Sequence, residues 1–521
     1  MGSNWNEVKL VDCCSLIKRG ISPKYTEDSE QGVPVLNQRC IRDYKVSLQN
    51  SRLNDIEKKK IPEDRKLQLY DVLINSTGVG TLGRVAQIKV LDSTTTVDSH
   101  VTIARLADSN IEKSFFGWVM KYNQPTFEAL GEGSTGQTEL SRHLVGDIKF
   151  KYPDCKKTQR VIASILDSLE SKIELNQQTN QTLEQMAQAL FKSWFVDFDP
   201  VFDNLLASVD FKLENLENRL PDELKQKAQR RLAALNSLKN AAEIKTSLIA
   251  LAHGLQAQLP TKEATQSAVQ ILGETAETPV KANLNSNPKI LAQHVNTHAH
   301  FPNEFEHNEQ LGWIPKGWEP SNLKEFGKVI TGKTPPKKID DAFDLEGIPF
   351  ITPSDVEGDV FTLNVIRHLT ESGVASVKNN IVEAESVCVT CIGSQMGKTT
   401  ITPVKSVTNQ QLNSIVLGEK YLRDYIFLNL RMRREELFNL GSSGSTMPIL
   451  NKTSFENLSV LKPNESSLKA FDDITESYLA KILLNSQNNT KLTTMRDTLL
   501  PKLISGELQI PDVATDEEIV D

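Results

Sequence analysis

The stretch TQRVIASILDSLESKIELNQQTNQTLEQMAQALFKSWF, residues 158–195, contains neither Gly nor Pro. Ten of its residues recur at alternating steps of four and three: Ile162, Leu166, Leu169, Ile173, Asn176, Asn180, Leu183, Ala187, Leu190 and Trp194. This heptad spacing predicts a long helix that packs along a partner helix. Two seam members, Asn176 and Asn180, are polar, and polar seam residues weaken packing but specify register and partner.

A second stretch near the C-terminus, TESYLAKILLNSQNNTKLTTMRDTLLPKLI at residues 475–504, follows the same spacing. It aligns with the first without a gap, which pairs Ile173 with Ile482, Asn176 with Asn485, Leu183 with Leu492, Met186 with Met495 and Leu190 with Leu499. The matched positions predict that the two helices pair within the chain as an antiparallel coiled coil. Two unrelated amphipathic helices are the alternative, and the coincidence of the Asn positions argues against it.

Length and composition indicate a protein of several domains with ordinary cores. The chain has 521 residues, of which 39% are hydrophobic. Its six Cys are too few for a disulfide framework, which favours a reducing cytoplasm. The N-terminal MGSNWNEVKL has no apolar signal region, and no apolar run approaches membrane-spanning length. We therefore expect a cytoplasmic protein with no membrane partner.

The net charge of −8 is a weak guide to the partners of this chain. Residues 1–152 carry 21 Lys and Arg against 19 Asp and Glu, a net charge of +2. The tail at residues 507–521 carries six acids and no Lys or Arg. Because the acidic charge is unevenly distributed, the total does not exclude a nucleic-acid ligand.

The segments that precede the two helices repeat one plan. GVPVL at residues 32–36 corresponds to GIPFI at 347–351, and VLI at 72–74 corresponds to VCV at 387–389. Short β-branched runs alternate with Gly, Asn and Ser turns in both segments, which indicates mixed α and β structure. The sequence therefore predicts an α+β protein with a pseudo-two-fold internal repeat. Its predicted parts are domains at 1–152 and 308–463, long helices at 153–200 and 464–506, a partly helical insertion at 201–307, and an acidic tail at 507–521.

Two glycine-rich motifs match nucleotide-binding patterns but lack the required context. GKVITGKT at residues 327–334 fits the phosphate loop, yet PPKK follows where a helix should begin. GVGTLG at 78–83 fits a dinucleotide turn, yet RVAQIKV after it reads as a strand, which predicts a hairpin loop. Nucleotide binding through residues 327–334 remains an alternative function.

Potential metal ligands are also sparse in the sequence. Cys388 and Cys391 form a lone CxxC, and no second pair completes a zinc site, so buried strand cysteines are the favoured interpretation. Four His cluster in a linker without periodicity, and we expect no metal there: His294, His298, His300 and His307. We find no catalytic constellation and predict no catalytic residues.

Several stretches resemble the specificity subunits of type I restriction-modification enzymes. They are TGVGTLGRV (77–85), STGQTEL (134–140), LFKSWFVDFDP (190–200), LGWIPKGWE (311–319) and LLPKLISGEL (499–508). The resemblance extends over nearly the whole chain except the insertion. It implies that the two globular domains are target-recognition domains, each reading one half of a split, asymmetric site in double-stranded DNA, with the helices as a coiled-coil spacer.

The resemblance also implies partners and cofactors. Two modification (methyltransferase) subunits would dock on the helices, and restriction (motor-nuclease) subunits would complete the complex in a bacterial or archaeal cytoplasm. The chain would be a non-catalytic subunit of a type I site-specific deoxyribonuclease and adenine DNA methyltransferase complex. It would bind no cofactor itself, with S-adenosylmethionine, ATP and Mg on the partner subunits.

Polar and basic residues in the variable loops are the candidates for DNA contacts, because Gln, Asn, Arg and Lys discriminate bases and Ser and Thr suit phosphates. In the first half they are Gln38, Arg39, Arg42, Thr77, Arg84, Thr135 and Gln137, and in the second they are Ser354, Gln395, Lys398, Asn409, Gln410, Ser443 and Ser445. Each could equally be a solvated loop residue.

An aromatic cluster at the end of the first helix holds the candidates for partner binding: Phe191, Trp194, Phe195 and Phe198. It exceeds what one helix seam can bury, although packing against the local domain is the alternative. A coiled-coil scaffold with two protein-binding domains is the competing function from the structural class, and it predicts no sequence-selective DNA binding.

Overall fold

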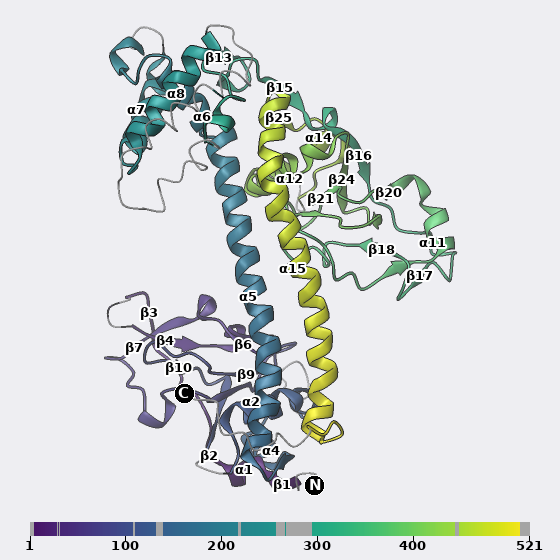
Figure 1. The fold of residues 1–521 in the computed structure, drawn as a ribbon. Helices are drawn as coiled ribbons and strands as arrows, with labels where there is room; N and C mark the ends of the chain where they lie inside the picture. Colours follow the sequence, from purple (N-terminus) through teal and green to yellow (C-terminus); the bar gives the residue numbers. More distant parts are fainter. Residues whose placement is uncertain are drawn as a thin grey trace. The chain divides into compact units, whose positions relative to one another are not determined.

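The computed structural model describes residues 5–28, 30, 32–107, 110–131, 139–216, 220–256, 266, 294–442 and 448–510. The chain divides into two compact units, unit 1 (Met1–Leu175 and Asn488–Asp521) and unit 2 (Asn176–Gln487) (Figure 1). Two long helices, α5 (Lys156–Phe195) and α15 (Glu465–Ser505), each contribute one half to unit 1 and the other half to unit 2. Among the described helices, none combines the length and hydropathy needed to cross a membrane.

Unit 1 contains a mixed α and β domain before α5. Its strands are β1 (Trp5–Lys9), β2 (Cys14–Arg19), β3 (Tyr25–Thr26), β4 (Gly32–Leu36), β5 (Ile41–Arg42), β6 (Lys45–Val46), β7 (Arg52–Asp55), β8 (Val72–Asn75), β9 (Val85–Gln87), β10 (Thr96–Val97), β11 (Val101–Leu106) and β12 (Lys149–Pro153). Its helices are α1 (Leu10–Cys13), α2 (Lys113–Tyr122), α3 (Gln124–Ala129) and α4 (Arg142–Asp147), with 3₁₀ turns η1 (Gln38–Cys40), η2 (Leu48–Asn50) and η3 (Glu63–Arg65).

Two four-stranded sheets form the frame of the unit 1 domain, with the orders β2-β11-β8-β9 and β10-β4-β7-β3. In the first sheet all neighbours are antiparallel, and in the second β10 runs parallel to β4. Helix α2 lies against the first sheet and buries Phe115, Phe116 and Trp118 completely. The same core takes in Ile162 and Leu166 of α5, so this half of the helix is packed against its own domain.

Unit 2 contains the insertion and a second mixed domain. Its strands are β13 (Phe305–Asn308), β14 (Gly312–Pro315), β15 (Glu319–Asn322), β16 (Gly327–Thr331), β17 (Phe343–Asp344), β18 (Ile348–Ile351), β19 (His368–Leu369), β20 (Ile381–Val382), β21 (Val387–Thr390), β22 (Thr399–Ile401), β23 (Ser406–Thr408), β24 (Leu412–Leu417) and β25 (Ser459–Lys462). Its helices are α6 (Asp199–Ala207), α7 (Asp222–Asn236), α8 (Ala241–Gln256), α11 (Glu371–Ser376), α12 (Arg423–Met432), α13 (Arg434–Ser442) and α14 (Lys452–Glu456), with 3₁₀ turns η4 (Leu213–Leu216), η5 (Leu323–Glu325), η6 (Lys378–Asn380) and η7 (Lys420–Leu422).

The strand topology confirms the internal repeat. The sheet order β16-β24-β21-β22 in unit 2 corresponds to β2-β11-β8-β9 in unit 1, and the antiparallel pair β15–β25 corresponds to β1–β12. The parallel pair β18–β23 corresponds to β4–β10. Helices α12, α13 and α14 occupy the chain positions of α2, α3 and α4. The fold is therefore one domain plan used twice, each copy followed by a long helix.

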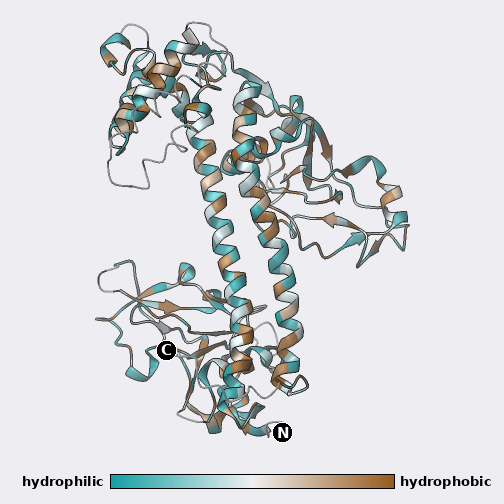
Figure 2. Ribbon diagram, viewed as in Figure 1, coloured by the Kyte–Doolittle hydropathy of each residue, from teal (hydrophilic) through white to brown (hydrophobic). Residues whose placement is uncertain are grey.

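The predicted antiparallel pairing of the long helices is confirmed within each unit. In unit 1, Asn489 Nδ2 of α15 lies 3.4 Å from the carbonyl oxygen of Ile173 in α5. In unit 2, Asn180 Nδ2 of α5 lies 3.5 Å from the carbonyl oxygen of Ile482 in α15. The two contacts use equivalent residues with the helices exchanged. Hydrophobic positions recur between hydrophilic ones along both helices (Figure 2).

The structure shows what the short glycine-rich and cysteine motifs form. Residues 78–83 lie in the loop of the antiparallel β8–β9 hairpin, so the hairpin prediction is confirmed. Cys388 is buried on β21 and Cys391 is buried directly after it, as expected. Residues 327–334 do not form a phosphate loop, because residues 327–331 form strand β16, paired with β24, where a phosphate loop requires a turn that opens a helix.

Candidate nucleic-acid interface

Three segments of the unit 1 domain meet at one edge of its main sheet. Strand β8 ends opposite the start of β11, because Asn75 pairs with Val101, so the loop after β8 lies beside the turn before β11. Thr77 Oγ1 in that loop lies 2.8 Å from His100 Nδ1 in that turn and accepts a hydrogen bond from Gln38 Nε2 of η1. Asn75 Nδ2 also donates to the carbonyl of Gln38 at 3.1 Å. The site is thus a polar edge built from three separate loops.

The β8–β9 loop has a backbone shape that depends on glycine. Gly78, Gly80 and Gly83 have φ angles of +103°, +73° and +83°. At Gly83 a Cβ atom would also lie 2.6 Å from the backbone nitrogen of Glu128 in α3, so a larger residue would push the loop from the helix. The Arg84 Nη2 atom donates to the carbonyl of Gly80 at 2.7 Å, which closes the loop. The tip residue Val79 is 82% exposed.

The sequence candidates in this half are only partly brought together. The structure joins Gln38 and Thr77, and Arg84 closes the same loop. The Arg39 side chain is exposed on η1, and exposed Arg42 lies beside Asp43, with Nε 3.4 Å from Oδ2. The candidates Thr135 and Gln137 lie outside the described residues. His100 was missed, and the sequence alone gave no sign that it would face Thr77.

The corresponding edge of the unit 2 domain is built in the same way. Residues 391–398 connect β21 to β22, and the turn at 409–411 precedes β24. The backbone N–H of Asn409 donates to the carbonyl of Ile351 at 2.9 Å, which repeats the 2.9 Å bond from Asp98 to Leu36 in unit 1. This bond brings the segment after β18 against the turn. The two domains therefore present equivalent loops at equivalent edges.

The candidates in the second half line this edge with a different chemistry. Ser354 is exposed and shares a 2.8 Å hydrogen bond with Thr352. Gln395 is exposed at the loop tip, whereas Lys398 Nζ donates to the carbonyl of Val356 at 3.0 Å. Asn409 is 9% exposed, and its side chain is occupied by Gln411 at 3.1 Å. Ser443 and Ser445 lie outside the described residues.

A lysine-rich segment beside this edge was not among the sequence candidates. Thr334 Oγ1 donates to Gln410 Oε1 at 2.8 Å, and the backbone N–H of Lys333 donates to the carbonyl of Thr408 at 2.8 Å. These bonds hold residues 333–338 against the turn that contains Gln410. The segment exposes Lys333, Lys337 and Lys338. The PPKK run was a visible signal, but it was read only as a helix breaker.

A close backbone contact explains why residue 332, in the stretch that matches the phosphate-loop pattern, is a glycine. A Cβ atom there would lie 2.1 Å from the carbonyl oxygen of Asn409, and at the equivalent Gly20 it would lie 1.9 Å from that of Val97. The glycine lets two backbone segments approach closely at this edge in both copies. Its conservation between the halves reflects packing of the edge, not a bound phosphate.

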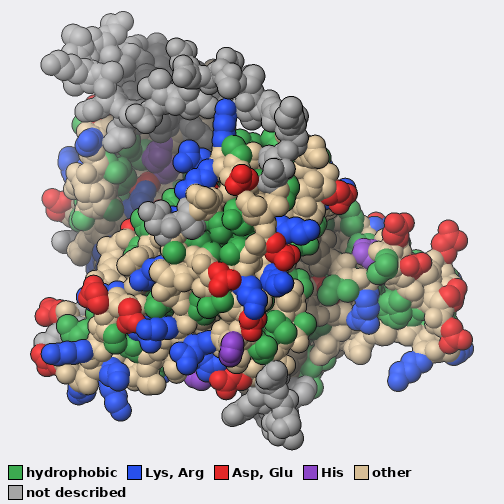
Figure 3. Space-filling model, turned by 90° about the horizontal axis from the view of Figure 1, so that it is seen from below, with side chains coloured by type: hydrophobic (Ala, Val, Ile, Leu, Met, Phe, Trp, Pro, Cys, Tyr) green, Lys and Arg blue, Asp and Glu red, His purple; other side chains and the backbone are tan. Residues whose placement is uncertain are grey.

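The charges on the molecule are mixed. Lys and Arg side chains on the face drawn in Figure 3 are interspersed with Asp and Glu. At the unit 1 edge, burial raises the pKa of Asp98, although its oxygen accepts a 2.9 Å hydrogen bond from the backbone N–H of His100.

The aromatic cluster proposed for partner binding is buried within unit 2. Phe191, Trp194, Phe195 and Phe198 are between 3% and 9% exposed. Phe195 packs edge-on to Tyr425 of α12 and Phe471 of α15, with ring centroids 4.9 and 5.0 Å apart. The rings exceed what one helix seam buries, and the second domain and the start of α15 cover the rest, which agrees with the alternative of packing against the local domain. They offer no free surface to a partner.

Comparison with known proteins identifies the family. The family described as "Type I restriction modification DNA specificity domain" matches residues 2–185 and 315–494, which together exceed half of the chain. The chain belongs to this type I restriction-modification specificity family. The two matched segments coincide with the two copies of the repeated domain plan and most of the helix that follows each. As a type I specificity subunit, the chain provides DNA sequence recognition within its system and is of a non-catalytic kind.

Individual relatives agree with this assignment. The "Type I restriction enzyme HindI specificity subunit" of Haemophilus influenzae is 28% identical over 515 residues, covering 97% of this chain and 100% of the relative. The "Type I restriction enzyme MjaIX specificity subunit" of Methanocaldococcus jannaschii is 23% identical over 394 residues, 74% of this chain and 67% of the relative. A crystal structure of the type I S subunit from M. genitalium covers 96% of both chains with a TM-score of 0.50 at 12% identity, a likeness of fold.

Proposed function

We propose that this specificity subunit reads a bipartite, asymmetric site in double-stranded DNA, with residues 1–152 and 308–463 as its two target-recognition domains. The observation that carries the proposal is the repeated recognition edge. Both domains hold the same backbone bonds at this edge, from Asp98 to Leu36 and from Asn409 to Ile351. The side chains differ, since Gln38, Thr77 and His100 form one edge and the lysine-rich segment 333–338 borders the other. The same backbone arrangement with different side chains in the two domains suits recognition of two different DNA half-sites.

Exchange of residues 1–152 for the same segment of a relative tests this function. Methylome sequencing of cells that carry the exchanged gene is expected to show a changed first half-site and an unchanged second half-site. A matched exchange of residues 308–463 is expected to change only the second half-site. Changes in both half-sites from one exchange, or no split methylated motif at all, would refute modular reading.

We further propose that two modification subunits dock on equivalent surfaces of the long helices, since the buried aromatic cluster is not available. Met186 of α5 and Met495 of α15 occupy equivalent repeat positions and are 45% and 52% exposed. Leu175 and Leu484, also equivalent, are 54% and 49% exposed. Exposed apolar side chains on helices otherwise rich in polar residues favour protein contact, and their duplication favours two copies of one partner.

Charge substitutions at these positions separate docking from folding. The double variant Met186→Glu with Met495→Glu is expected to lose co-purification of the modification subunit while retaining far-ultraviolet circular dichroism. The matched control places Glu at the neighbouring exposed positions Gln185 and Thr494 and is expected to assemble normally. Normal assembly by the methionine variant would refute this docking surface.

We assign cofactor binding to the partner subunits and not to this chain. S-adenosylmethionine would be bound by the modification subunits, and ATP and Mg by restriction subunits that join them to form a methyltransferase and nuclease complex. The specificity subunit would recognise the target DNA sequence and provide the surfaces on which the other subunits dock. Equilibrium dialysis of the isolated chain with labelled S-adenosylmethionine and with ATP is expected to show no binding, and saturable binding of either would contradict this division of roles.

A further inference from the structure

The insertion between the first long helix and the second domain is closed at its base by α6. This helix follows α5 directly, and its Asn204 Nδ2 donates to the carbonyl oxygens of His298 and Phe301 at 2.8 and 2.9 Å. Asn204 is 6% exposed, so these bonds are shielded from water. Segments separated by 94 positions in sequence therefore meet in one buried polar contact.

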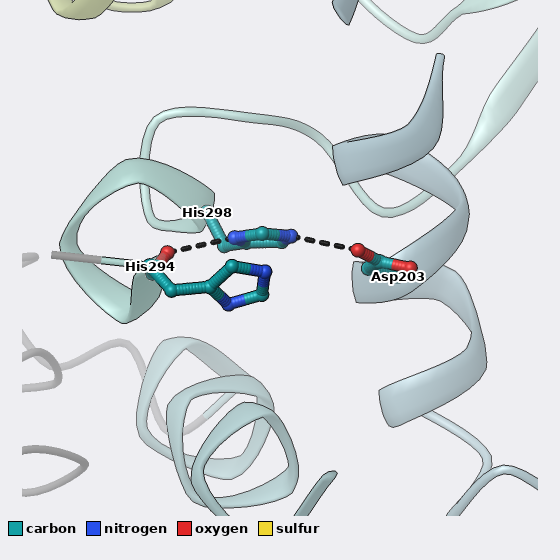
Figure 4. A group of neighbouring side chains, drawn as sticks. All are labelled: Asp203, His294 and His298. Atoms are coloured by element: carbon teal, nitrogen blue, oxygen red, sulfur yellow. Dashed lines mark hydrogen bonds and ion pairs between the residues drawn. The ribbon is translucent and has the colours of Figure 1, made fainter. Parts of the chain in front are cut away.

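Three potential metal ligands meet at this base. Asp203 of α6 faces His294 and His298, which lie four residues apart on one helical turn at 294–298. One ligand atom from each residue lies within 4.8 Å of those of the other two. The two imidazole rings are stacked with centroids 3.9 Å apart, and Figure 4 shows them beside the Asp203 carboxylate. The expectation that no secondary structure fixes these histidines is wrong.

Each ring nitrogen of His298 faces an acceptor oxygen. His298 Nδ1 lies 2.7 Å from the carbonyl oxygen of His294, and His298 Nε2 lies 2.9 Å from Asp203 Oδ2. Both oxygens are acceptors, whereas a neutral imidazole has a single N–H. When Nδ1 donates to the carbonyl, a proton or a metal ion must lie between Nε2 and the carboxylate, and a metal ion can take the place of that proton. Donation by the other ring nitrogen to a carbonyl is the usual support of a metal-bound histidine.

The charged groups around Asp203 carry a net negative charge, which favours binding of a cation. Arg231 of α7 grips Asp203 with Nε on Oδ1 and Nη2 on Oδ2, both at 2.7 Å, and its Nη1 lies 3.3 Å from Asp199 Oδ2. One guanidinium is thus shared by two carboxylates, and the net charge of Arg231, Asp199 and Asp203 together is −1. Each carboxylate oxygen has two acceptor positions, so Oδ2 keeps one toward the histidines. A hydrogen bond to a ligating carboxylate is a common orienting contact.

We propose that Asp203, His294 and His298 bind a divalent transition-metal ion of the zinc type, which fastens the two ends of the insertion to each other. Two imidazoles and one carboxylate form a ligand set that zinc accepts with water in the fourth position. Zinc–nitrogen bonds of about 2.0–2.1 Å require the donors to draw together, and half-buried His294 is the side chain that can move. The site is structural, because it ties residues 294–301 to α6.

Zinc binding by the full-length protein tests the site. Protein stripped with a chelator, refilled with zinc and desalted is expected to retain one zinc ion per chain by elemental analysis. The His294→Gln variant is expected to bind zinc at least tenfold more weakly, while His253→Gln, at an exposed position of α8 in the same insertion, should bind like the parent chain.

Cobalt provides a readout that does not depend on a variant. Cobalt(II) in the parent chain is expected to give the visible absorption of a tetrahedral ion with nitrogen ligands, and zinc should bleach it. Cobalt absorption identical to that of the free aqueous ion would overturn the proposal. Equal zinc retention by the parent chain and a folded His294→Gln variant would also overturn it.

Discussion

The buried amides in the helix seam provide a quantitative test of how the two long helices recognise each other. In unit 2, Asn485 Nδ2 donates to Asn180 Oδ1 at 2.9 Å, and Asn180 Nδ2 donates to Ser486 Oγ at 3.0 Å. Asn485 is only 3% exposed, so water cannot replace its hydrogen bond. The perturbation is a pair of substitutions, Asn485→Leu and Asn180→Leu, made singly and together.

The magnitudes follow from which polar atoms are left unpaired. Asn485→Leu removes the donor that Asn180 Oδ1 accepts from in the half-buried seam, and loss of such a partner costs about 1–3 kcal/mol. Asn180→Leu removes the acceptor of the hydrogen bond that Asn485 Nδ2 donates, with a similar cost. When both residues are Leu, no amide is left unpaired and apolar seam contact increases, so the double variant should lie within about 1 kcal/mol of the parent chain. With about 2 kcal/mol lost in each single variant and almost none in the double variant, the expected coupling energy is on the order of 4 kcal/mol, opposite in sign to the single effects.

Urea unfolding of the full-length chain, followed by circular dichroism at helix wavelengths, measures these differences. For a slope of about 2 kcal/mol per molar urea, each single variant should lower the midpoint of the helix transition by roughly 1 M. Gln178→Leu is the matched control, because Gln178 lies exposed on α5 and its change should stay within about 0.5 kcal/mol. Single variants as stable as the parent chain, or a double variant that loses the sum of the single effects, would refute the reasoning.

Four further outcomes are expected. Gly332→Ala should destabilise unit 2 by more than about 1 kcal/mol in thermal unfolding, because its Cβ would meet a carbonyl oxygen at 2.1 Å, whereas Gly418→Ala, with its nearest neighbour at 3.7 Å, should not. Trp194→Ala should cost about 3–5 kcal/mol and reduce soluble yield with or without the modification subunit, since the ring is core; selective loss of assembly by a fully stable variant would contradict this. Lys337→Ala with Lys338→Ala should reduce the slope of log K against log salt for DNA binding of the assembled complex by up to about 2, and an unchanged slope would exclude phosphate contacts there. Seven residues inserted at matching places in both long helices should lengthen each by about 10 Å and widen the gap between methylated half-sites by roughly three base pairs, and an unchanged gap would show that the helices do not set the spacing.

Local sequence patterns alone were sufficient for the repeated plan of this protein. The heptad spacing and the coincident Asn176 and Asn485 predicted two long helices that pair antiparallel, because side-chain periodicity along a helix is set by the geometry of the backbone itself. The hairpin at residues 78–83 was predictable for the same kind of reason, since a strand pattern follows the glycines directly. The family resemblance rested on these same local stretches.

Contacts between distant segments required the tertiary structure. Sequence showed an excess of aromatic rings from Phe191 onward, but only the packed domain shows that Tyr425 and Phe471 cover them. His100 joins Thr77 because two antiparallel strands place their ends together. Asp203 lies more than ninety positions from His294 and His298, and no periodic pattern relates residues across such a distance. Burial and hydrogen bonding of side chains depend on which surfaces meet when the chain packs, and the local backbone preferences of a sequence do not specify that.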